Sequence, residues 1–233
     1  MRHIILTLTL FSCLGIFSGC VVPGLVPPET VPTDVTVVNT SYQVELNPAR
    51  PATQGLIFYP GGLVAPEAYI PLLAPLADAG VRVIITRPWL GLAVFNPQAA
   101  WYVVDREPPL QWYVAGHSLG GAMAVKAVKG KPQLFAGLAL LGAYADTADD
   151  YSQGTLPVVS ISATQDGLST PAEIEVGKSR LPADTRYVVL EGGNHAQFGS
   201  YGPQRGDGNA TMSEEKQQQL TRQALWELLA ISR

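Results

Sequence analysis

Short runs of apolar, β-branched residues alternate along the chain with longer segments of helical periodicity, and this alternation constrains the fold more than any other feature. Several runs are apolar at every position, as strands are when both faces of a parallel sheet are covered. The pattern predicts the α/β class, with a mostly parallel sheet and helices on both faces. The predicted strands are Val35–Leu46, Gly55–Tyr59, Val81–Thr86, Gln111–Ala115, Gly137–Leu141, Val158–Ala163 and Arg186–Leu190. The predicted helices are Pro66–Ala79, about Pro97–Val104, Leu119–Lys129, Pro171–Arg180 and Ser213–Ile231.

Length and charge narrow the range of functions. A chain of 233 residues with 47% apolar residues suits one globular unit with a large core. Its 15 Lys and Arg against 19 Asp and Glu give a formal charge of -4, so no basic surface is expected for a nucleic-acid partner. The intervals between predicted elements are too short for a sizeable inserted lid. We expect a monomer.

The N-terminus has the layout of an export signal. Arg2 precedes an apolar run, and the small residues Ser18 and Gly19 stand directly before Cys20. This arrangement resembles a bacterial lipoprotein signal, which implies acylation of Cys20 and anchoring in the cell envelope. We therefore predict a signal peptide over 1–19, an anchored, proline-rich tether over 20–34 and the folded domain over 35–233.

Two alternatives for the N-terminus remain open. Cys13 offers a second acylation site, although its apolar region would be short. An uncleaved helix from Ile4 to about Val22 is the other alternative, which Ser12 and Gly15 weaken as a membrane span. Both a lipid anchor and an uncleaved helix export the domain. Acylation at Cys20 would leave no free thiol, which excludes a disulfide, a catalytic cysteine and a thiolate metal site.

A glycine-flanked serine follows the fourth predicted strand. The segment Gly116-His117-Ser118-Leu119-Gly120 has the form G-x-S-x-G and lies between a strand and a helix. In that context a serine sits on a sharp, strained turn, and the glycines remove side chains that would collide there. Ser118 is therefore the candidate nucleophile.

A serine hydroxyl needs a base to accept its proton, and that base is usually a histidine. The chain has three histidines. His3 lies in the signal, and His117 adjoins the serine and is expected to point away from it and serve packing. His195 remains, in a glycine-rich loop directly after the last predicted strand. By elimination and position, His195 is the predicted general base.

The carboxylate that orients the base should follow another strand end, between the serine and the histidine. Asp166 does so, directly after the strand Val158–Ala163. Asp146, Asp149 and Asp150 compete with it, but their polar cluster is more typical of a solvated loop. Asp166 is therefore the predicted acid.

Two backbone N–H groups should stabilise the negative charge that develops on the substrate oxygen. The residue after the nucleophile, Leu119, supplies one. The second comes from Tyr59-Pro60-Gly61-Gly62-Leu63, where glycines allow close approach of the backbone. We place it on Gly62, with Leu63 as the alternative.

The stretch from Gly55 to Ile231 resembles the α/β-hydrolase superfamily, in particular its short, lidless bacterial members of the dienelactone-hydrolase-like and carboxylesterase-like branches. The segments that carry this resemblance are Tyr59-Pro60-Gly61-Gly62, Gly116-His117-Ser118-Leu119-Gly120-Gly121-Ala122, Thr164-Gln165-Asp166-Gly167, Glu191-Gly192-Gly193-Asn194-His195-Ala196-Gln197-Phe198-Gly199 and Tyr201-Gly202-Pro203-Gln204 to Asp207-Gly208. The resemblance implies a Ser-His-Asp triad. Dienelactone hydrolases use a cysteine where this chain has Ser118, which favours ester hydrolysis.

The leading hypothesis is a membrane-anchored serine hydrolase that cleaves small or medium carboxylic esters through an acyl-enzyme, with no cofactor and no metal. An amidase or peptidase would use the same triad. A lipoprotein that keeps the fold but only binds ligands is the alternative from another class. No nucleotide-binding loop of the G-x-G-x-x-G or G-x-x-x-x-G-K type is present in the sequence.

Overall fold

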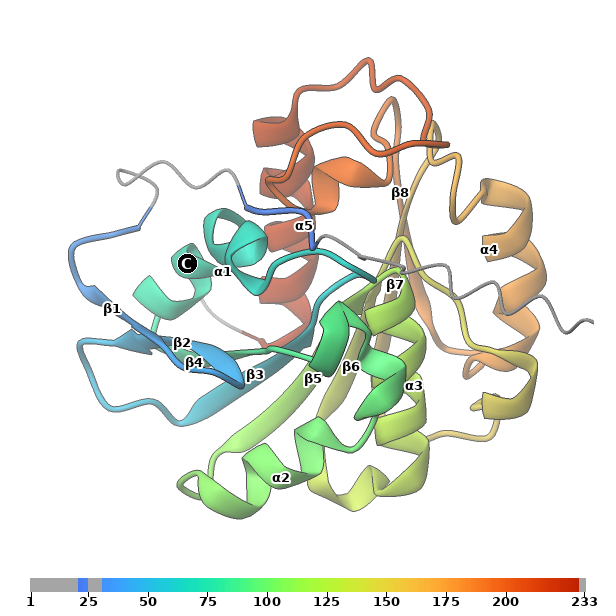
Figure 1. Cartoon of the computed structure of the whole chain (residues 1–233). Helices are drawn as coiled ribbons and strands as arrows, with labels where there is room; N and C mark the ends of the chain where they lie inside the picture. The colour runs from blue at the N-terminus through green and yellow to red at the C-terminus, as the bar shows by residue number, and fades with distance from the viewer. Residues whose placement is uncertain (1–20, 25–30, 231–233) are drawn as a thin grey trace, which may run out of the picture.

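The computed structural model describes residues 21–24 and 31–230. The predicted signal segment and Cys20 lie outside the described residues. Within them the chain forms an eight-stranded sheet of order β1-β2-β4-β3-β5-β6-β7-β8 (Figure 1). The strands are β1 (Val35–Asn39), β2 (Gln43–Pro48), β3 (Gln54–Tyr59), β4 (Val81–Thr86), β5 (Gln111–His117), β6 (Gly137–Leu141), β7 (Val158–Ala163) and β8 (Arg186–Leu190). From β4 to β8 every pairing is parallel, which confirms the predicted class.

The prediction of a single strand over Val35–Leu46 was wrong in one respect. The segment forms two strands, β1 and β2, which pair as an antiparallel hairpin. The chain reverses at Thr40, whose N–H and hydroxyl both donate to the Gln43 carbonyl oxygen at 2.9 and 3.0 Å. The Gln43 N–H donates back to the Thr40 hydroxyl. A threonine side chain can close a turn in this way without glycine or proline, so the sequence carries no obvious break there.

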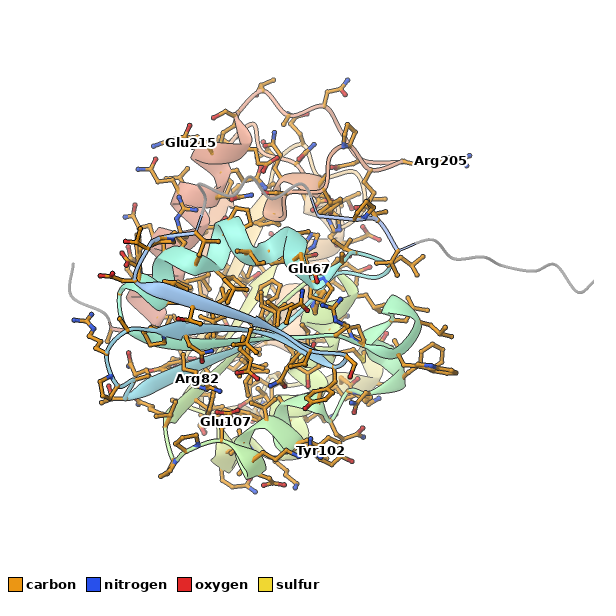
Figure 2. The ribbon with its side chains drawn as sticks, turned by 60° about the vertical axis from the view of Figure 1, so that its left-hand side comes forward. Glu67, Arg82, Tyr102, Glu107, Arg205 and Glu215 are labelled. Atoms are coloured by element: carbon orange, nitrogen blue, oxygen red, sulfur yellow. The ribbon has the colours of Figure 1, made fainter. Side chains whose placement is uncertain are left out.

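Five α-helices of the described region cover the sheet, and α1 and α5 lie on one face while α2 and α3 lie on the other. In Figure 2 the helix after Glu67 lies above the sheet and the helix that carries Tyr102 lies below it. The helices are α1 (Ile70–Asp78), α2 (Ala99–Arg106), α3 (Leu119–Gly130), α4 (Pro171–Gly177) and α5 (Glu214–Leu228). The predicted cap Ser213 accepts the Lys216 N–H at the start of α5. None of these helices is long and apolar enough to cross a membrane.

The sheet separates two clusters of buried side chains. Leu72, Leu73 and Leu76 of α1 are fully buried against one face. On the other face, Val125 and Val128 of α3 are fully buried. Each such aliphatic side chain stabilises the fold by about 1.5–3 kcal/mol through burial. The two clusters fix the sheet between rigid layers, and the loops at its carboxyl ends carry the polar residues described next.

Candidate active site

Ser118 occupies a one-residue turn between the end of β5 and the start of α3. Its backbone is left-handed, with φ 54° and ψ -126°, a conformation that costs a residue other than glycine about 1–3 kcal/mol. The turn is held from both sides, because the Ser118 N–H donates to the Leu141 carbonyl at 3.0 Å and its carbonyl accepts from Gly121 at 2.9 Å. The side chain is half-buried and lies at the N-terminal, positive end of α3.

Three glycines let the backbone approach closely around this turn. A Cβ atom on Gly116 would lie 2.4 Å from the Gly120 backbone, and one on Gly120 would lie 2.2 Å from the Tyr59 carbonyl oxygen. A Cβ atom on Gly121 would meet Ala143 at 2.4 Å. These separations are far below van der Waals contact. A side chain at Gly116 would push β5 from α3, one at Gly120 would push α3 from the end of β3, and one at Gly121 would push α3 from the loop after β6.

Asp166 and His195 form a buried pair. The His195 Nδ1 atom lies 2.8 Å from the Asp166 Oδ2 atom, and the two residues are 1% and 3% exposed. The other oxygen of Asp166 accepts the Leu168 and Ser169 N–H groups at 2.8 and 2.7 Å. With both oxygens engaged, the carboxylate has a fixed orientation and fixes that of the imidazole.

The three residues predicted from the sequence meet at the same edge of the sheet. The rings of His117 and His195 are 4.4 Å apart between centroids, which places His195 beside the residue that precedes Ser118. Gly142, which has φ 47° and which sequence analysis did not single out, would point a Cβ atom to within 3.0 Å of Asp166 Oδ2 and 3.2 Å of His195 Nδ1. In the described structure no hydrogen bond joins the Ser118 hydroxyl to His195. Such bonds commonly tighten only when substrate is bound.

The competing aspartates lie elsewhere. Asp146 and Asp150 are exposed and accept the N–H groups of Ala148 and Ser152 in their own loop. Asp149 is 8% exposed, so the expectation that it lies in solvent was wrong. Its carboxylate turns inward toward Lys126 of α3, 3.6 Å away. None of the three contacts His195.

The loop after β3 approaches the start of α3. A Cβ atom on Gly62 would lie 3.2 Å from Leu119 Cδ2, so the two predicted donor residues are neighbours. Leu119 opens α3, where the first N–H groups have no acceptor within the helix. The Leu63 N–H, by contrast, already donates to the Gly91 carbonyl at 2.7 Å. Of the two candidates on this loop, Gly62 therefore remains.

A buried hydrogen-bond chain connects this loop to the turn at Ser118. The Gly61 N–H donates to the Tyr69 hydroxyl at 2.9 Å, and that hydroxyl lies 2.9 Å from His117 Nδ1. Burial lowers the pKa of His117 well below its usual range, and the charge of His195 lowers it further. His117 therefore stays neutral at physiological pH, and it joins two loops of the site in addition to packing.

Asp207 holds the loops that carry Asp166 and His195, a role that sequence analysis missed. Its Oδ1 accepts the N–H groups of His195 at 3.1 Å and Gly167 at 3.2 Å, and also that of Gly208. Its Oδ2 accepts the Ala196 N–H at 2.8 Å. One half-buried carboxylate thus connects the residue after Asp166 to the backbone of His195.

Gln217 of α5 adds a second clamp on the same loop. Its side-chain amide accepts the Asn194 N–H at 3.0 Å and donates to the Asn194 carbonyl at 2.7 Å. Gly193 permits this approach, because a Cβ atom there would lie 2.5 Å from the Gln217 oxygen. Gln217 is fully buried on the inner face of α5, which it shares with the polar residues Gln218 and Thr221 and with Ala224 and Leu225. A polar residue at core-facing spacing was the signal that could have revealed it.

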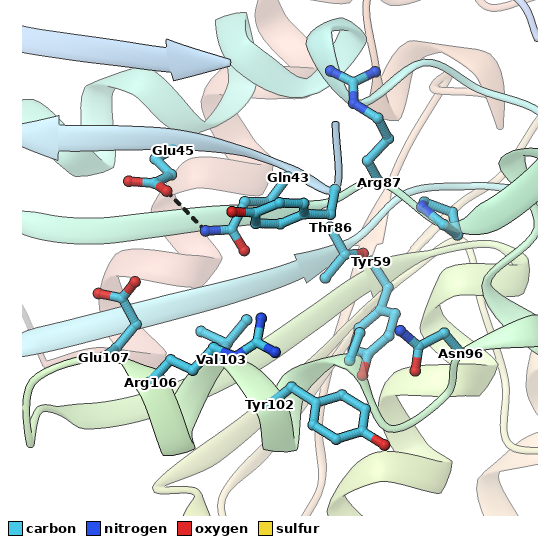
Figure 3. Close-up of a pocket in the computed structure, with 13 residues that line it drawn as sticks. Gln43, Glu45, Tyr59, Thr86, Arg87, Asn96, Tyr102, Val103, Arg106 and Glu107 are labelled. Atoms are coloured by element: carbon cyan, nitrogen blue, oxygen red, sulfur yellow. Dashed lines mark hydrogen bonds between the residues drawn. The ribbon is translucent and has the colours of Figure 1, made fainter. Parts of the chain in front are cut away.

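A cavity of about 410 Å³ lies away from these residues, between β2, β4 and α2 (Figure 3). Gln43, Glu45, Tyr59 and Tyr102 are among its lining residues, whereas Ser118, Asp166 and His195 are not. Tyr59 forms part of its floor, and its hydroxyl bonds the Pro97 carbonyl and the Ala100 N–H of the α2 region. This cavity is separate from the candidate active site.

A strained serine between a parallel strand and a helix, beside a buried His–Asp pair, defines a class of enzymes built on a doubly covered parallel sheet. Residues 55–219 match the family model described as "Alpha/beta hydrolase family". The chain belongs to this family and is a hydrolase. A comparison with curated proteins finds no match.

Three solved structures that share the fold are distant in sequence. Est1E from Butyrivibrio proteoclasticus superposes with a TM-score of 0.61 at 14% identity, covering 85% of this chain and 100% of its own. The thermophilic esterase Est2 from Thermogutta terrifontis gives 0.58 at 16% identity and covers 88% and 96%. A metagenome-derived lipolytic enzyme described with LipS and LipT gives 0.57 at 15% identity and covers 70% and 92%. At these identities the likeness shows the fold.

Replacing Asp207 with Asn should lower turnover about 10- to 100-fold while the protein stays folded. The amide has one acceptor oxygen instead of two, so its NH₂ group would face a backbone N–H. Losing charge-assisted hydrogen bonds costs about 1.5–3 kcal/mol. If this energy no longer holds His195 in place and is added to the activation barrier, the rate falls tenfold for every 1.36 kcal/mol. Steady-state kinetics on a soluble ester, with thermal unfolding in parallel, measures this.

The matched control is Asp184→Asn, which changes an exposed carboxylate. Its turnover should equal that of the wild type. A folded Asp207→Asn variant with turnover within twofold of the wild type would show that the backbone holds the loop without this carboxylate.

Proposed function

We propose that this hydrolase cleaves carboxylic esters through an acyl-enzyme, with Ser118 as nucleophile, His195 as general base and Asp166 as the orienting acid. The observation that carries the proposal is the buried pair of His195 Nδ1 and Asp166 Oδ2 at 2.8 Å beside the left-handed turn at Ser118. Because Nδ1 is bonded to the carboxylate, Nε2 is the ring nitrogen left free to exchange a proton with Ser118.

The first half of the reaction follows from this geometry. His195 Nε2 takes the proton of the Ser118 hydroxyl as Oγ attacks the ester carbonyl carbon, and the electron pair of the C=O bond moves to oxygen. The N–H groups of Gly62 and Leu119 donate to that oxygen. When the tetrahedral intermediate collapses, the bond to the alcohol oxygen breaks, and His195 returns the proton to the departing alcohol.

The second half repeats these steps with water. His195 takes a proton from water as the water oxygen attacks the acyl carbon. Collapse breaks the bond to Ser118 Oγ, which regains its proton from His195. Asp166 accepts the Nδ1–H hydrogen bond throughout, so Nε2 is the nitrogen free for proton transfer. The cycle consumes one ester and one water and releases an acid and an alcohol.

Esters are proposed over amides because the solved structures that share the fold are described as esterases or lipolytic enzymes. Small or medium acyl groups fit a site with no large inserted lid, in line with the carboxylesterase-like branch that the sequence resembles. An amidase would hydrolyse the matched anilide as well as the ester, whereas an esterase would leave the anilide essentially intact. A protein that only binds would turn over neither.

Ser118→Ala should reduce ester turnover by about 10³-fold or more, because the nucleophile is removed. Asp166→Asn should reduce it by about 10³- to 10⁴-fold, because the amide stabilises the tautomer that blocks Nε2. Initial rates on p-nitrophenyl acetate and butyrate measure both. Both variants should unfold at the wild-type temperature within a few degrees.

Asp146→Asn is the control for the acid, since Asp146 is exposed and caps its own turn. Its turnover should stay close to the wild-type value. If Asp166→Asn stays within about tenfold of the wild type, the acid is misassigned. If Ser118→Ala keeps its turnover, the nucleophile is misassigned.

We further propose that residues 1–19 are an export signal and that Cys20 is acylated, which would anchor the domain in a bacterial cell envelope through a tether over 20–34. The support is the order of basic residue, apolar run, small residues and cysteine. Acyl chains partition into a bilayer with about 0.8 kcal/mol per buried CH₂ group, so lipidation would provide the membrane attachment.

Cys20→Ser should abolish metabolic labelling with palmitate and move the protein out of the processed membrane fraction. Cys13→Ser is the matched control, because it removes the other cysteine of the chain and should keep the label. Palmitate labelling that survives in Cys20→Ser, or that disappears in Cys13→Ser instead, would place the lipid elsewhere.

A further inference from the structure

We propose that the protein docks on the bilayer surface through an exposed apolar patch beside the loop that carries Gly62. This contact would hold the Ser118 site at the lipid–water boundary. The proposal adds to the proposed anchoring and rests on it for the attachment to a membrane. The apolar patch consists of the side chains of Val21, Val22, Trp89, Leu90, Val94 and Phe95.

The patch is unusual in composition and exposure. Trp89, Leu90 and Phe95 are 68%, 58% and 52% exposed, within a few residues of one another. The sequence from Pro88 to Val104 contains no charged residue. Contiguous exposed apolar side chains of this kind mark a surface that meets a partner or a membrane. Tryptophan in particular favours the boundary between headgroups and hydrocarbon.

The backbone holds these side chains outward. Leu90 has a left-handed conformation with φ 52° and ψ 22°, and Gly91 follows with φ 70°. The Gly91 carbonyl accepts the Leu63 N–H at 2.7 Å, and the Leu92 N–H donates back to Trp89 at 3.1 Å. A left-handed leucine is disfavoured, so the surroundings impose this geometry. The loop is therefore built to present its apolar side chains to the outside.

The N-terminal segment identifies the bilayer as the occupant. Val22 forms a bridge with Val64, as its N–H donates to the Leu63 carbonyl at 2.7 Å and its carbonyl accepts from Ala65 at 2.9 Å. A Cβ atom on Gly91 would lie 3.0 Å from Val21 Cγ2. Cys20 directly precedes Val21. An acyl chain on Cys20 would therefore enter the membrane beside the patch.

The same patch borders the catalytic machinery. Leu63, bonded to Gly91, is the neighbour of Gly62, whose N–H is proposed as an oxyanion donor. A Cβ atom on Gly62 would lie 3.2 Å from Leu119 Cδ2 and 3.5 Å from Leu92 Cδ2. An apolar surface thus runs from the exposed loop to the residue after Ser118. A protein docked by this face would hold Ser118 close to the lipid–water boundary.

The test uses the full, anchored chain reconstituted in vesicles of phosphatidylethanolamine and phosphatidylglycerol that contain phospholipid brominated on its acyl chains. Bromine quenches tryptophan fluorescence only on close approach. Trp89 is the exposed tryptophan, whereas Trp112 is 2% exposed. Docking predicts quenching in the wild type and loss of at least half of it in Trp89→Phe, which keeps an apolar side chain but removes the fluorophore.

A second variant tests the patch with Trp89 in place. Leu90→Asn suits the left-handed backbone at that position, and combined with Phe95→Gln it removes two apolar side chains. This double variant should halve the bromine quenching of Trp89. The matched control is Val176→Gln with Val189→Thr, which changes two residues that are 65% and 55% exposed outside the patch. Its tryptophan fluorescence should be quenched to the same extent as that of the wild type.

The outcomes separate docking from the other proposals. Docking is overturned if the wild-type protein floats with the vesicles but is quenched no more than Trp89→Phe. It is also overturned if the patch variant changes only the hydrolysis of soluble long-chain esters, because the loop would then be an acyl-binding surface. Quenching does not require turnover, so it is also measured in Ser118→Ala. Failure of the proposed ester hydrolysis would leave that measurement unchanged, whereas failure of anchoring would appear as wild-type protein that does not float.

Discussion

The left-handed backbone of Ser118 depends on a close approach of three elements that side chains would prevent. The end of β3, the end of β5 and the first turn of α3 meet where Gly116, Gly120 and Gly121 leave no room for a Cβ atom. This contact orients α3, so that its positive end lies at the serine, and it brings the Gly62 loop beside Leu119. The strain of one residue, about 1–3 kcal/mol, is small against the burial of the two apolar clusters that hold the elements together.

A second layer of polar contacts positions the loops on either side of that turn. The Asp207 carboxylate and the Gln217 amide bond backbone groups near His195 and Asp166, so they fix the loops that carry these two residues. The chain from Gly61 through Tyr69 to neutral His117 does the same between the loop that carries Gly62 and β5. Because Gln217 and Tyr69 are buried, leaving either without its partner would cost about 1–3 kcal/mol, which makes the arrangement sensitive to single substitutions.

Much of this fold was predictable from the sequence because its strands are apolar on both faces and its turns carry glycine. The candidate site was predictable because G-x-S-x-G follows a strand and only His195 remained as a base. The missed features depend on contacts between residues far apart in the chain. Asp207 bonds Gly167 across 40 positions, and no local pattern marks that contact. The burial of Asp149, the hairpin at Thr40 and the engagement of Leu63 by Gly91 likewise depend on three-dimensional neighbours.

The central claim is that the described geometry activates one hydroxyl, that of Ser118. Peptide mapping after reaction of the native protein with a fluorophosphonate tests this most directly. The tryptic peptide Glu107–Lys126 contains Ser118 as its single serine, so an adduct there identifies the residue. The account predicts one adduct per chain, on this peptide, in native protein and none after denaturation, because activation needs the assembled site. An adduct on another peptide, or equal labelling of native and denatured protein, would contradict it.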